Sequence, residues 1–561
     1  MADVTSISTS AQRFITLLPK RTQLFYVPFF MQPVTMRRGK LGGQYLSDLL
    51  ATKPIDQLLA ESRDESESGL RRVLGPVNLV TLGIGAIIGA GIFVLTGTVA
   101  ATFTGPAIVI SFILAATGCI FAGLCYAEFA SLIPIAGSAY TYGYATLGEI
   151  FAWIIGWDLI IEYAFGAASV AVGWSGNLVA LFQSFGIQIP PQMTAPPGTL
   201  LVLYNGQWLR LATIGPTLAS AGIDSAKLPS AHGVLDLPAY LVIAAMTAIL
   251  VIGVRESANF NSLIVFIKVG TVLTFIGIVG AYLLRHPDIA ARNWHPFIPP
   301  NEGSFGAFGW SGIARGAGVI FFAYIGFDAV STAAQEARNP QRDMPIGILG
   351  SLAICTVLYV SLGATLTGIV NYKLLNTAAP VALGIQATGV RWGSIVVMLG
   401  TFAGLTTTML VMLLGQSRVF FSMARDGLLP EWAGRVHPRF RTPWISSIVV
   451  GFFVAIIAGL LPINVLSQLT SIGTLLAFVI VSAGVWALRV KRPDLPRPFK
   501  APLIWKSLPL TPLLGMGISL GLMASLPWST WLRLIAWLIV GMLIYFGYGR
   551  SHSKLRTLTP K

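Results

Sequence analysis

The sequence predicts an all-α polytopic membrane protein, and three observations lead to this fold class. Of the 561 residues, 54% are hydrophobic and only 11% are charged, whereas a soluble domain carries about 25% charged residues. The mean hydropathy is +0.74. Apolar runs long enough to cross a bilayer, which takes about 20 residues, recur along most of the chain. We therefore expect a bundle of helices embedded in a membrane.

The apolar runs number twelve, which places both ends of the chain on the same side of the membrane. The runs cover residues 76–100, 106–131, 148–181, 236–255, 258–284, 309–334, 345–370, 392–416, 443–461, 465–488, 508–527 and 530–548. With the termini inside, most of the 37 Lys and Arg residues fall on the cytoplasmic side, as the positive-inside rule requires. We expect a multi-pass protein of the cytoplasmic membrane with both termini in the cytoplasm.

Three segments lie outside the predicted spans. Residues 1–73 are expected to form a cytoplasmic N-terminal segment, and residues 549–561 a cytoplasmic tail. The stretch of about 182–235 is rich in Pro, Gly and Ser and nearly uncharged, which favours an external loop. Met36 is an alternative start, because the 35 residues before it have a different composition.

The composition argues against several other classes of protein. The net charge of +15 is typical of basic cytoplasmic loops in a membrane protein rather than of nucleic-acid binding. The three cysteines, Cys119, Cys125 and Cys355, lie within apolar runs, and the five histidines show no ligand spacing. These patterns do not fit a disulfide framework or a metal site. We expect no metal, no cofactor, no catalytic residues and no nucleic-acid partner.

The first span contains four glycines at its centre, in the stretch "GIGAIIGAGIF" (83–93). Glycine is the weakest helix former after proline, so this pattern predicts a broken helix at membrane depth. One alternative is a packing motif, because Gly85 and Gly89 are spaced as small residues often are where membrane helices touch.

The sixth span repeats this feature five spans later. It holds further glycines and Asp328 near its middle. Two interrupted helices at matching places in successive units indicate an inverted-repeat transporter. A break leaves amide N–H groups at the start of one half-helix and carbonyls at the end of the other. An amino acid carries a carboxylate and an ammonium on one carbon, so it can satisfy both sets, and the half-helix dipoles favour this arrangement.

Five stretches carry a resemblance to a known family. They are "GIGAIIGAGIFVLTG", "IIGWDLIIEYAFGAASVAVGWSG", "FFAYIGFDAVSTAAQEARNPQRDMPIGILGSL", "GQSRVFFSMARDGLLP" and "RVKRPDLPRPFKAPL". From about Leu74 onward the chain resembles a bacterial-type member of the cationic amino acid transporter family, within the amino acid–polyamine–organocation superfamily. The resemblance implies a five-plus-five inverted repeat, with residues 74–284 as the first repeat, residues 309–488 as the second, and two further helices in 489–548.

The resemblance also implies where an amino acid would bind. The amides of Gly89, Ala90 and Gly91 would face its carboxylate. The carbonyls that would face its ammonium are those of Ile87, Phe322, Ala323 and Ile325. Ala90 stands where family members often have a hydroxyl residue, so one side-chain hydrogen bond would be missing here.

Acidic residues within apolar spans are functional hypotheses by default, because they are costly there. Glu128 lies near the cytoplasmic end of its span, where snorkelling could keep it wet, and we expect a structural role. Asp158 and Glu162 are four residues apart and share a helix face; Glu162 matches a pocket-lining acid of the family. Asp328 either caps the half-helix after the break or shapes the pocket. Glu162 and Asp328 are the acids at a plausible depth to balance a cationic side chain, and we expect a preference for small neutral or cationic amino acids.

Lys268 lies about ten residues, roughly 15 Å, from the start of its helix. The resemblance places its amine at the position where sodium-coupled relatives bind a cation. There it would face carbonyls near Gly83 and hydroxyls of Thr406, Thr407 and Thr408, and it would carry the coupling proton. The alternative is a structural or snorkelling lysine.

The function that follows is a secondary active permease, a proton-coupled symporter of L-amino acids that works by alternating access. The partners are an amino acid, a proton and the lipid bilayer, and the sequence permits a monomer. The alternatives are an amino acid exchanger, a sodium-coupled carrier, an ion channel and, more distantly, a membrane-embedded enzyme.

Overall fold

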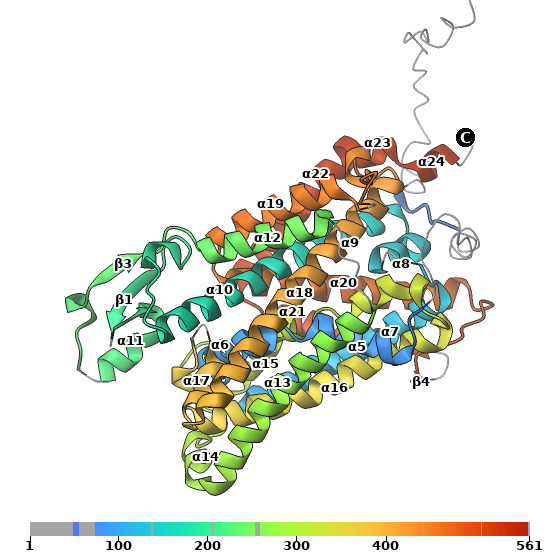
Figure 1. Ribbon diagram of the computed structural model, residues 1–561. Coiled ribbons are helices and arrows are strands. Elements are labelled where there is room, and N and C mark those ends of the chain that lie inside the picture. Colours follow the sequence, from blue (N-terminus) through green and yellow to red (C-terminus); the bar gives the residue numbers. More distant parts are fainter. Residues whose placement is uncertain are drawn as a thin grey trace, which may run out of the picture. The chain divides into compact units, whose positions relative to one another are not determined.

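The computed structural model describes most of the chain after the N-terminal segment (Figure 1). The described residues are 49–54, 73–135, 138–204, 206–220, 222–252, 258–377, 379–440, 442–505 and 508–558. The expectations for residues 1–48, including the alternative start at Met36, lie outside these ranges.

Helices occupy every apolar run that the sequence predicts. The first part of the chain forms α5 (Pro76–Ile87), η1 (Gly91–Leu95), α6 (Thr96–Val99), η2 (Ala100–Thr104), η3 (Gly105–Ala107), α7 (Ile108–Leu132), α8 (Ser138–Thr146), α9 (Glu149–Ile160), η4 (Ile161–Phe165), α10 (Gly166–Ser184), α12 (Leu237–Ile252) and α13 (Ala258–Arg285). The second part forms α15 (Gly309–Ile320), η7 (Phe321–Tyr324), η8 (Asp328–Glu336), α16 (Pro340–Ile369), α18 (Arg391–Arg425), α19 (Trp444–Leu460), α20 (Ile463–Lys491), α21 (Leu510–Ser525), α22 (Trp528–Ile544) and η11 (Tyr545–Gly549). Short connecting helices are η5 (Pro191–Met193), α11 (Leu211–Ser220), η6 (Ser225–Lys227), α14 (Pro287–Asn293), η9 (Tyr372–Leu374), α17 (Pro380–Gln386), η10 (Glu431–Gly434), α23 (Arg550–His552) and α24 (Lys554–Leu558).

Eight helical stretches in the described residues are long and apolar enough to cross a membrane. They are Gly91–Leu132, Glu149–Gln183, Ser262–Arg285, Gly309–Ala334, Pro340–Ile369, Trp392–Arg425, Ile463–Lys491 and Trp528–Arg556. Four shorter apolar helices join them: Pro76–Ile87, Leu237–Ile252, Trp444–Leu460 and Leu510–Ser525. Together the two sets overlap all twelve predicted runs, because the stretch that begins at Gly91 continues from the first run into the second.

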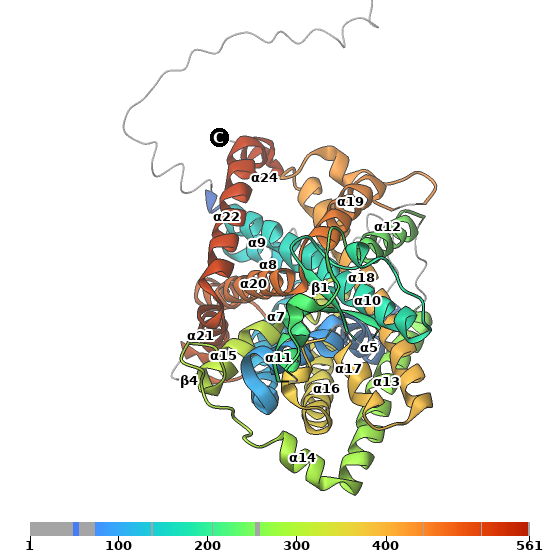
Figure 2. The ribbon, with the colours of Figure 1, turned by 90° about the vertical axis from the view of Figure 1, so that its left-hand side faces the viewer.

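The predicted loop between the third and fourth runs is a small folded unit that the sequence did not reveal. Its three strands, β1 (Leu200–Tyr204), β2 (Gln207–Arg210) and β3 (Ser230–His232), form an antiparallel sheet in the order β2-β1-β3. This sheet and α11 lie at one end of the bundle, and the C-terminal helices lie at the other (Figures 1 and 2). We call these the sheet end and the tail end. A two-stranded ribbon, β4 (Ile504–Trp505) with β5 (Leu508–Pro509), precedes α21.

The main helix pairs come from distant parts of the chain. α16 packs against α7 and α5, α12 against α19, α10 and α13 against α18, and α20 against α21. Glycines allow some of these approaches: a side chain on Gly451 of α19 would collide with Thr247 of α12, and one on Gly400 of α18 with Thr271 of α13. In an apolar solvent such close van der Waals packing is a main source of helix association.

The first and sixth runs are both interrupted, and their breaks touch. α5 ends at Ile87 and η1 begins at Gly91, while a bend at 325–327 separates η7 from η8. A Cβ on Gly91 would lie 2.3 Å from Cα of Ala323, and one on Gly326 would lie 2.9 Å from the carbonyl carbon of Ala86. Gly326 also has a φ of +115°, which residues with a Cβ rarely adopt. The glycines therefore bring backbone directly against backbone.

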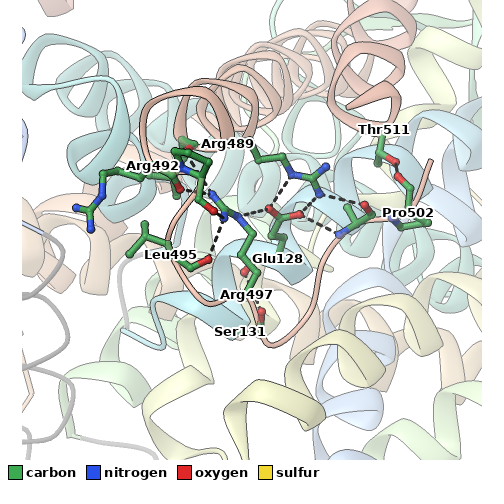
Figure 3. A network of polar contacts seen from close by, with 11 residues as sticks. Glu128, Ser131, Arg489, Arg492, Leu495, Arg497, Pro502 and Thr511 are labelled. Carbon is green, nitrogen blue, oxygen red and sulfur yellow. Dashed lines mark hydrogen bonds and ion pairs between the residues drawn. The ribbon is translucent and has the colours of Figure 1, made fainter. Parts of the chain in front are cut away.

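A buried ion-pair network secures the tail end (Figure 3). Glu128 on α7 accepts from Arg489 Nε of α20 at 3.0 Å and from the amide of Ala501 at 2.9 Å. A second bond joins Arg489 Nη2 to Glu128 Oε2, and Arg497 Nε forms an ion pair with the same carboxylate at 3.3 Å. The segment that follows α20 is thereby folded back onto α7.

The expectation that Glu128 snorkels to water is wrong, whereas the ion pairs of its carboxylate fit the expected structural role. Its side chain is only 3% exposed, and the side chains of the two arginines are each 8% exposed. Burial of a charge is tolerated when it is paired and hydrogen-bonded, and three groups from residues 489–501 meet this requirement. The local sequence did not show these partners, because they lie more than 360 residues further along the chain.

We predict that Glu128→Ala destabilises the protein by about 3–5 kcal/mol, because it leaves the buried guanidinium of Arg489 without its counter-charge. Thermal denaturation in detergent, followed by size-exclusion chromatography, measures this loss. Asp494→Ala is the control, since Asp494 forms an exposed ion pair with Arg492 and exposed pairs contribute little. Equal melting temperatures for the two variants would contradict the structural role of Glu128.

A second prediction concerns the crossing of the breaks. Gly326→Ala should lower the melting temperature clearly, because it combines an unfavourable φ with a collision against Ala86; strained backbone of this kind costs about 1–3 kcal/mol. Gly277→Ala on α13 is the matched control, since a Cβ there meets nothing within 4 Å and alanine favours a helix. A Gly326→Ala protein as stable as the Gly277→Ala protein would show that the breaks do not need this close approach.

Candidate functional site

The end of α5 exposes carbonyl oxygens in the apolar interior. The last carbonyls of any helix lack intrahelical partners, and an unpaired backbone group costs several kcal/mol where no water is present. α5 ends in the middle of the bundle, among residues that are almost fully buried. The carbonyls of Gly85, Ile87 and Ile88 nevertheless all have donors, and these donors come from three other helices.

Lys268 of α13 is the central donor. Its Nζ lies 2.6 Å from the carbonyl oxygen of Gly85, 3.1 Å from that of Ile88 and 3.0 Å from Oγ1 of Thr408. An ammonium has three N–H donors and no acceptor, and these three oxygens match it. The residue itself is completely buried, so a lysine that snorkels to the surface is ruled out by its position.

The amine of Lys268 contacts carbonyls of the first helix near Gly83 and the hydroxyl of Thr408, as predicted, whereas Thr406 and Thr407 form other bonds. The carbonyls that face the amine belong to Gly85 and Ile88 instead of Gly83, which packs against Ser351 of α16. Thr406 accepts from Trp174 Nε1, and Thr407 donates to carbonyls of its own helix. The reason is helical periodicity: three consecutive residues on α18 point in different directions, and the hydroxyl of Thr408 is the one that meets the amine of Lys268.

Tyr359 of α16 is a site residue that the sequence did not indicate. Its hydroxyl donates to the carbonyl oxygen of Ile87 at 3.0 Å. Ile87 was predicted to face the ammonium of a substrate, and its carbonyl keeps one lone pair for that purpose. A tyrosine within an apolar run carries no spacing signal of its own, so only the packing of α16 against α5 reveals this contact.

The predicted backbone donors and acceptors lie together where the two breaks meet. Gly89, Ala90 and Gly91 precede or begin η1, so their amides lie at a helix start, where N–H groups lack intrahelical partners. On the other helix Phe322 and Ala323 belong to η7 and Ile325 begins the bend. The Phe322 carbonyl also accepts from the Ile325 amide at 3.3 Å. All these residues are buried.

The acidic residues Glu162 and Asp328 lie beside each other in this interior. Glu162 lies on η4, a π-helical turn, and such turns are rare and frequent at functional sites. Asp328 begins η8 and accepts from the hydroxyl of Tyr163 at 3.0 Å. Neither oxygen of Glu162 has a hydrogen-bond partner of normal geometry in the described part of the chain. Unsatisfied buried carboxyl groups of this kind need a functional explanation.

Asp158 is separate from this pair in its contacts. It lies one helical turn before Glu162 and faces α20, where a Cβ on Gly473 would lie 3.0 Å from its Oδ1. Its carboxylate oxygens likewise lack partners among the described residues. The shared helix face of Asp158 and Glu162 is therefore present, and it points toward the bundle interior.

Comparison with known proteins identifies the family of this chain. Residues 74–553 match the family model described as amino acid permease. A branched-chain amino acid permease and a methylthioribose transporter of Bacillus subtilis are each 42% identical to this chain, over 90% and 91% of it and 98% and 100% of their own lengths. A vacuolar cationic amino acid transporter of Arabidopsis thaliana is 35% identical over 80% of this chain and 68% of its own length. These names describe transporters and not enzymes. The chain belongs to the amino acid permease family, as a bacterial-type relative of the cationic amino acid transporters in the amino acid–polyamine–organocation superfamily.

Proposed function

We propose that this protein is a secondary active transporter of L-amino acids, coupled to protons and working by alternating access. The observation that carries the proposal is the contact between the two helix breaks, where Gly91 meets Ala323 and Gly326 meets Ala86. This contact brings helix-start amides of one break against carbonyls of the other. A zwitterion with a carboxylate and an ammonium on one carbon matches the two sets of groups.

The packing of helices supports the inverted repeat. When the twelve runs are taken in order, the second packs against the seventh (α7 with α16), the third against the eighth (α10 with α18) and the fourth against the ninth (α12 with α19). The first and sixth meet at their breaks. Each of these pairs is five runs apart, as expected if residues 74–284 and 309–488 are repeats with opposite orientation. The positive-inside rule assigns the tail end to the cytoplasm and the sheet end to the outside.

Lys268 is the proposed carrier of the coupling proton. Protonated, its ammonium holds the end of α5 to α13 and α18 through Gly85, Ile88 and Thr408. Loss of the proton removes one N–H donor and the charge, which weakens this attachment and lets the first helix move. A monovalent cation would fit the same three oxygens, and for this reason a sodium-coupled carrier is the main alternative to a proton-coupled one. An exchanger is the second.

The preferred side chain is proposed to be small and neutral or cationic. Glu162 and Asp328 provide negative charge near the breaks, which would balance a cationic side chain. Two of the relatives are named after branched-chain and cationic amino acids, so the transport test includes both classes of substrate. Methylthioribose lacks both a carboxylate and an ammonium, and its transport would not use the two sets of backbone groups.

We predict that both end groups of the amino acid are required. In proteoliposomes, labelled valine or lysine should be displaced by unlabelled amino acids at least tenfold better than by their decarboxylated amines, isobutylamine and cadaverine. The reason is that the amides of Gly89, Ala90 and Gly91 lose their charged partner in an amine. Equal competition by the amines, or by methylthioribose, would overturn the assignment of the backbone site.

We also predict that Lys268→Ala abolishes the stimulation of uptake by external acid, so that uptake with and without an imposed pH gradient becomes equal. The same experiment on Thr407→Val is the control, because the described hydrogen bonds of the Thr407 hydroxyl go to carbonyls of its own helix, α18. Size-exclusion chromatography verifies that the variant is folded. Wild-type uptake that requires sodium and ignores pH would refute proton coupling.

A further inference from the structure

A cavity of about 100 Å³ lies at the sheet end of the bundle. Its walls include Val94 and Thr98 of the first span, Gly173 of α10, Asn464 of α20 and Thr377 of the segment before α17. The remaining wall comes from the sheet unit, through Arg210 and the neighbouring Ala212. One water needs about 10–15 Å³ of such space, so the cavity can hold several waters or a carboxylate with its carbon.

The cavity lies close to the proposed substrate site. Val94 in its wall is three residues after Gly91 on η1, a π-helical turn. A Cβ on Gly173 would lie 3.1 Å from Val94 Cγ2 and 3.5 Å from Ala90 Cβ, so the residues between cavity and break are in close contact. A substrate that enters from the sheet end would therefore pass the cavity directly before it reaches the breaks.

Arg210 places a positive charge at this point. It is the last residue of β2, where it pairs with Leu201 of β1, and the sheet holds it against the transmembrane helices. Burial lowers the pKa of its guanidinium, yet arginine stays protonated in proteins. Within the described part of the chain no carboxylate lies within ion-pair distance of Arg210, and its guanidinium has no hydrogen-bond acceptor.

The acid whose charge acts on Arg210 is Asp236; its Oδ2 has no hydrogen-bond partner in the described structure, whereas its Oδ1 is held by other groups. Asp236 Oδ1 accepts from the hydroxyl of Ser175 and, at 3.2 Å, from the amide of Ala239 at the start of α12. A second polar group of the cavity wall also lacks a partner: the hydroxyl of Thr377 is buried without a hydrogen bond in the described structure. The wall thus offers a guanidinium and a hydroxyl, both without a partner.

This combination fits one class of ligand. Arg210 is partly buried at the cavity, and a guanidinium fork matches a carboxylate with two parallel hydrogen bonds. We propose that Arg210 forms an outer binding site for the α-carboxylate of incoming amino acids and selects neutral amino acids over cationic ones. The inference rests on the proposed function. The carboxylate would first bind Arg210 and Thr377, then pass inward to the amides of Gly89, Ala90 and Gly91.

Selectivity follows from charge. A neutral amino acid presents its carboxylate to Arg210 while its ammonium remains further away. A cationic amino acid brings an additional positive charge into the same poorly hydrated space, where like charges repel more strongly than in water. Arg210 should therefore lower the KM for neutral substrates more than for cationic ones, and it should not affect the inner steps that set kcat.

The test compares Arg210→Gln and Arg210→Lys with Lys227→Gln in cells, where uptake starts from the outer face. Lys227 belongs to the same sheet unit and is exposed, so its variant removes one positive charge away from the cavity. For Arg210→Gln we expect the KM for leucine to rise at least tenfold, the KM for lysine to change less than threefold, and kcat to stay within twofold. Arg210→Lys should give an intermediate KM for leucine.

Several outcomes would overturn the inference. A KM for leucine in Arg210→Gln equal to that in Lys227→Gln would do so, as would equal changes for leucine and lysine. If Arg210→Gln is not found folded at the cell surface, Thr377→Ala replaces it, with an expected rise of two- to fivefold for leucine only, and an unchanged value then rejects the site. A wild-type protein that takes up no amino acid contradicts the proposed function itself, which is a separate result.

Discussion

The interruption of the first helix is the constraint on which the rest of the structure depends. Its end leaves backbone carbonyls in an apolar interior, where each unpaired group costs several kcal/mol. Lys268, Tyr359 and Thr408 supply the missing donors from α13, α16 and α18. The break therefore joins four helices that are far apart in the sequence. A helix without the break would need none of these donors, and the buried Lys268 would then lose the carbonyl acceptors of Gly85 and Ile88.

The same few residues connect the proposed substrate site with the proposed proton site. The carbonyl of Ile88 accepts from both Lys268 and Thr408, and the next amide along the chain belongs to Gly89, which we assign to the substrate carboxylate. A change in the protonation of Lys268 would thus act on a peptide unit adjacent to the substrate. This arrangement offers a short physical route for coupling, through one segment of backbone rather than through a long chain of side chains.

The two ends of the bundle differ in a way that suits transport. At the tail end, Glu128 binds two arginines and folds the segment after α20 back onto α7, which holds helices together. At the sheet end, β2 places Arg210 in the wall of a cavity near the breaks, and in the described chain its guanidinium forms no ion pair with a carboxylate. Paired buried charges stabilise a fixed structure, whereas a charge without a partner is available to a ligand. The proposed outer site therefore lies where movement and exchange are expected.

Much of the architecture could be predicted from local patterns alone. Apolar length determined the positions of the twelve runs, glycine content marked the first break, and the depth of Lys268 in its run indicated a buried lysine. Tertiary structure decided the rest: the choice of Gly85 and Ile88 over Gly83, the donor role of Tyr359, and the ion pairs of Glu128. The sheet that carries Arg210 also escaped prediction. The physical reason is that these contacts join residues roughly 180 to 370 positions apart, and their partners are set by how helices pack, which local periodicity and composition do not encode.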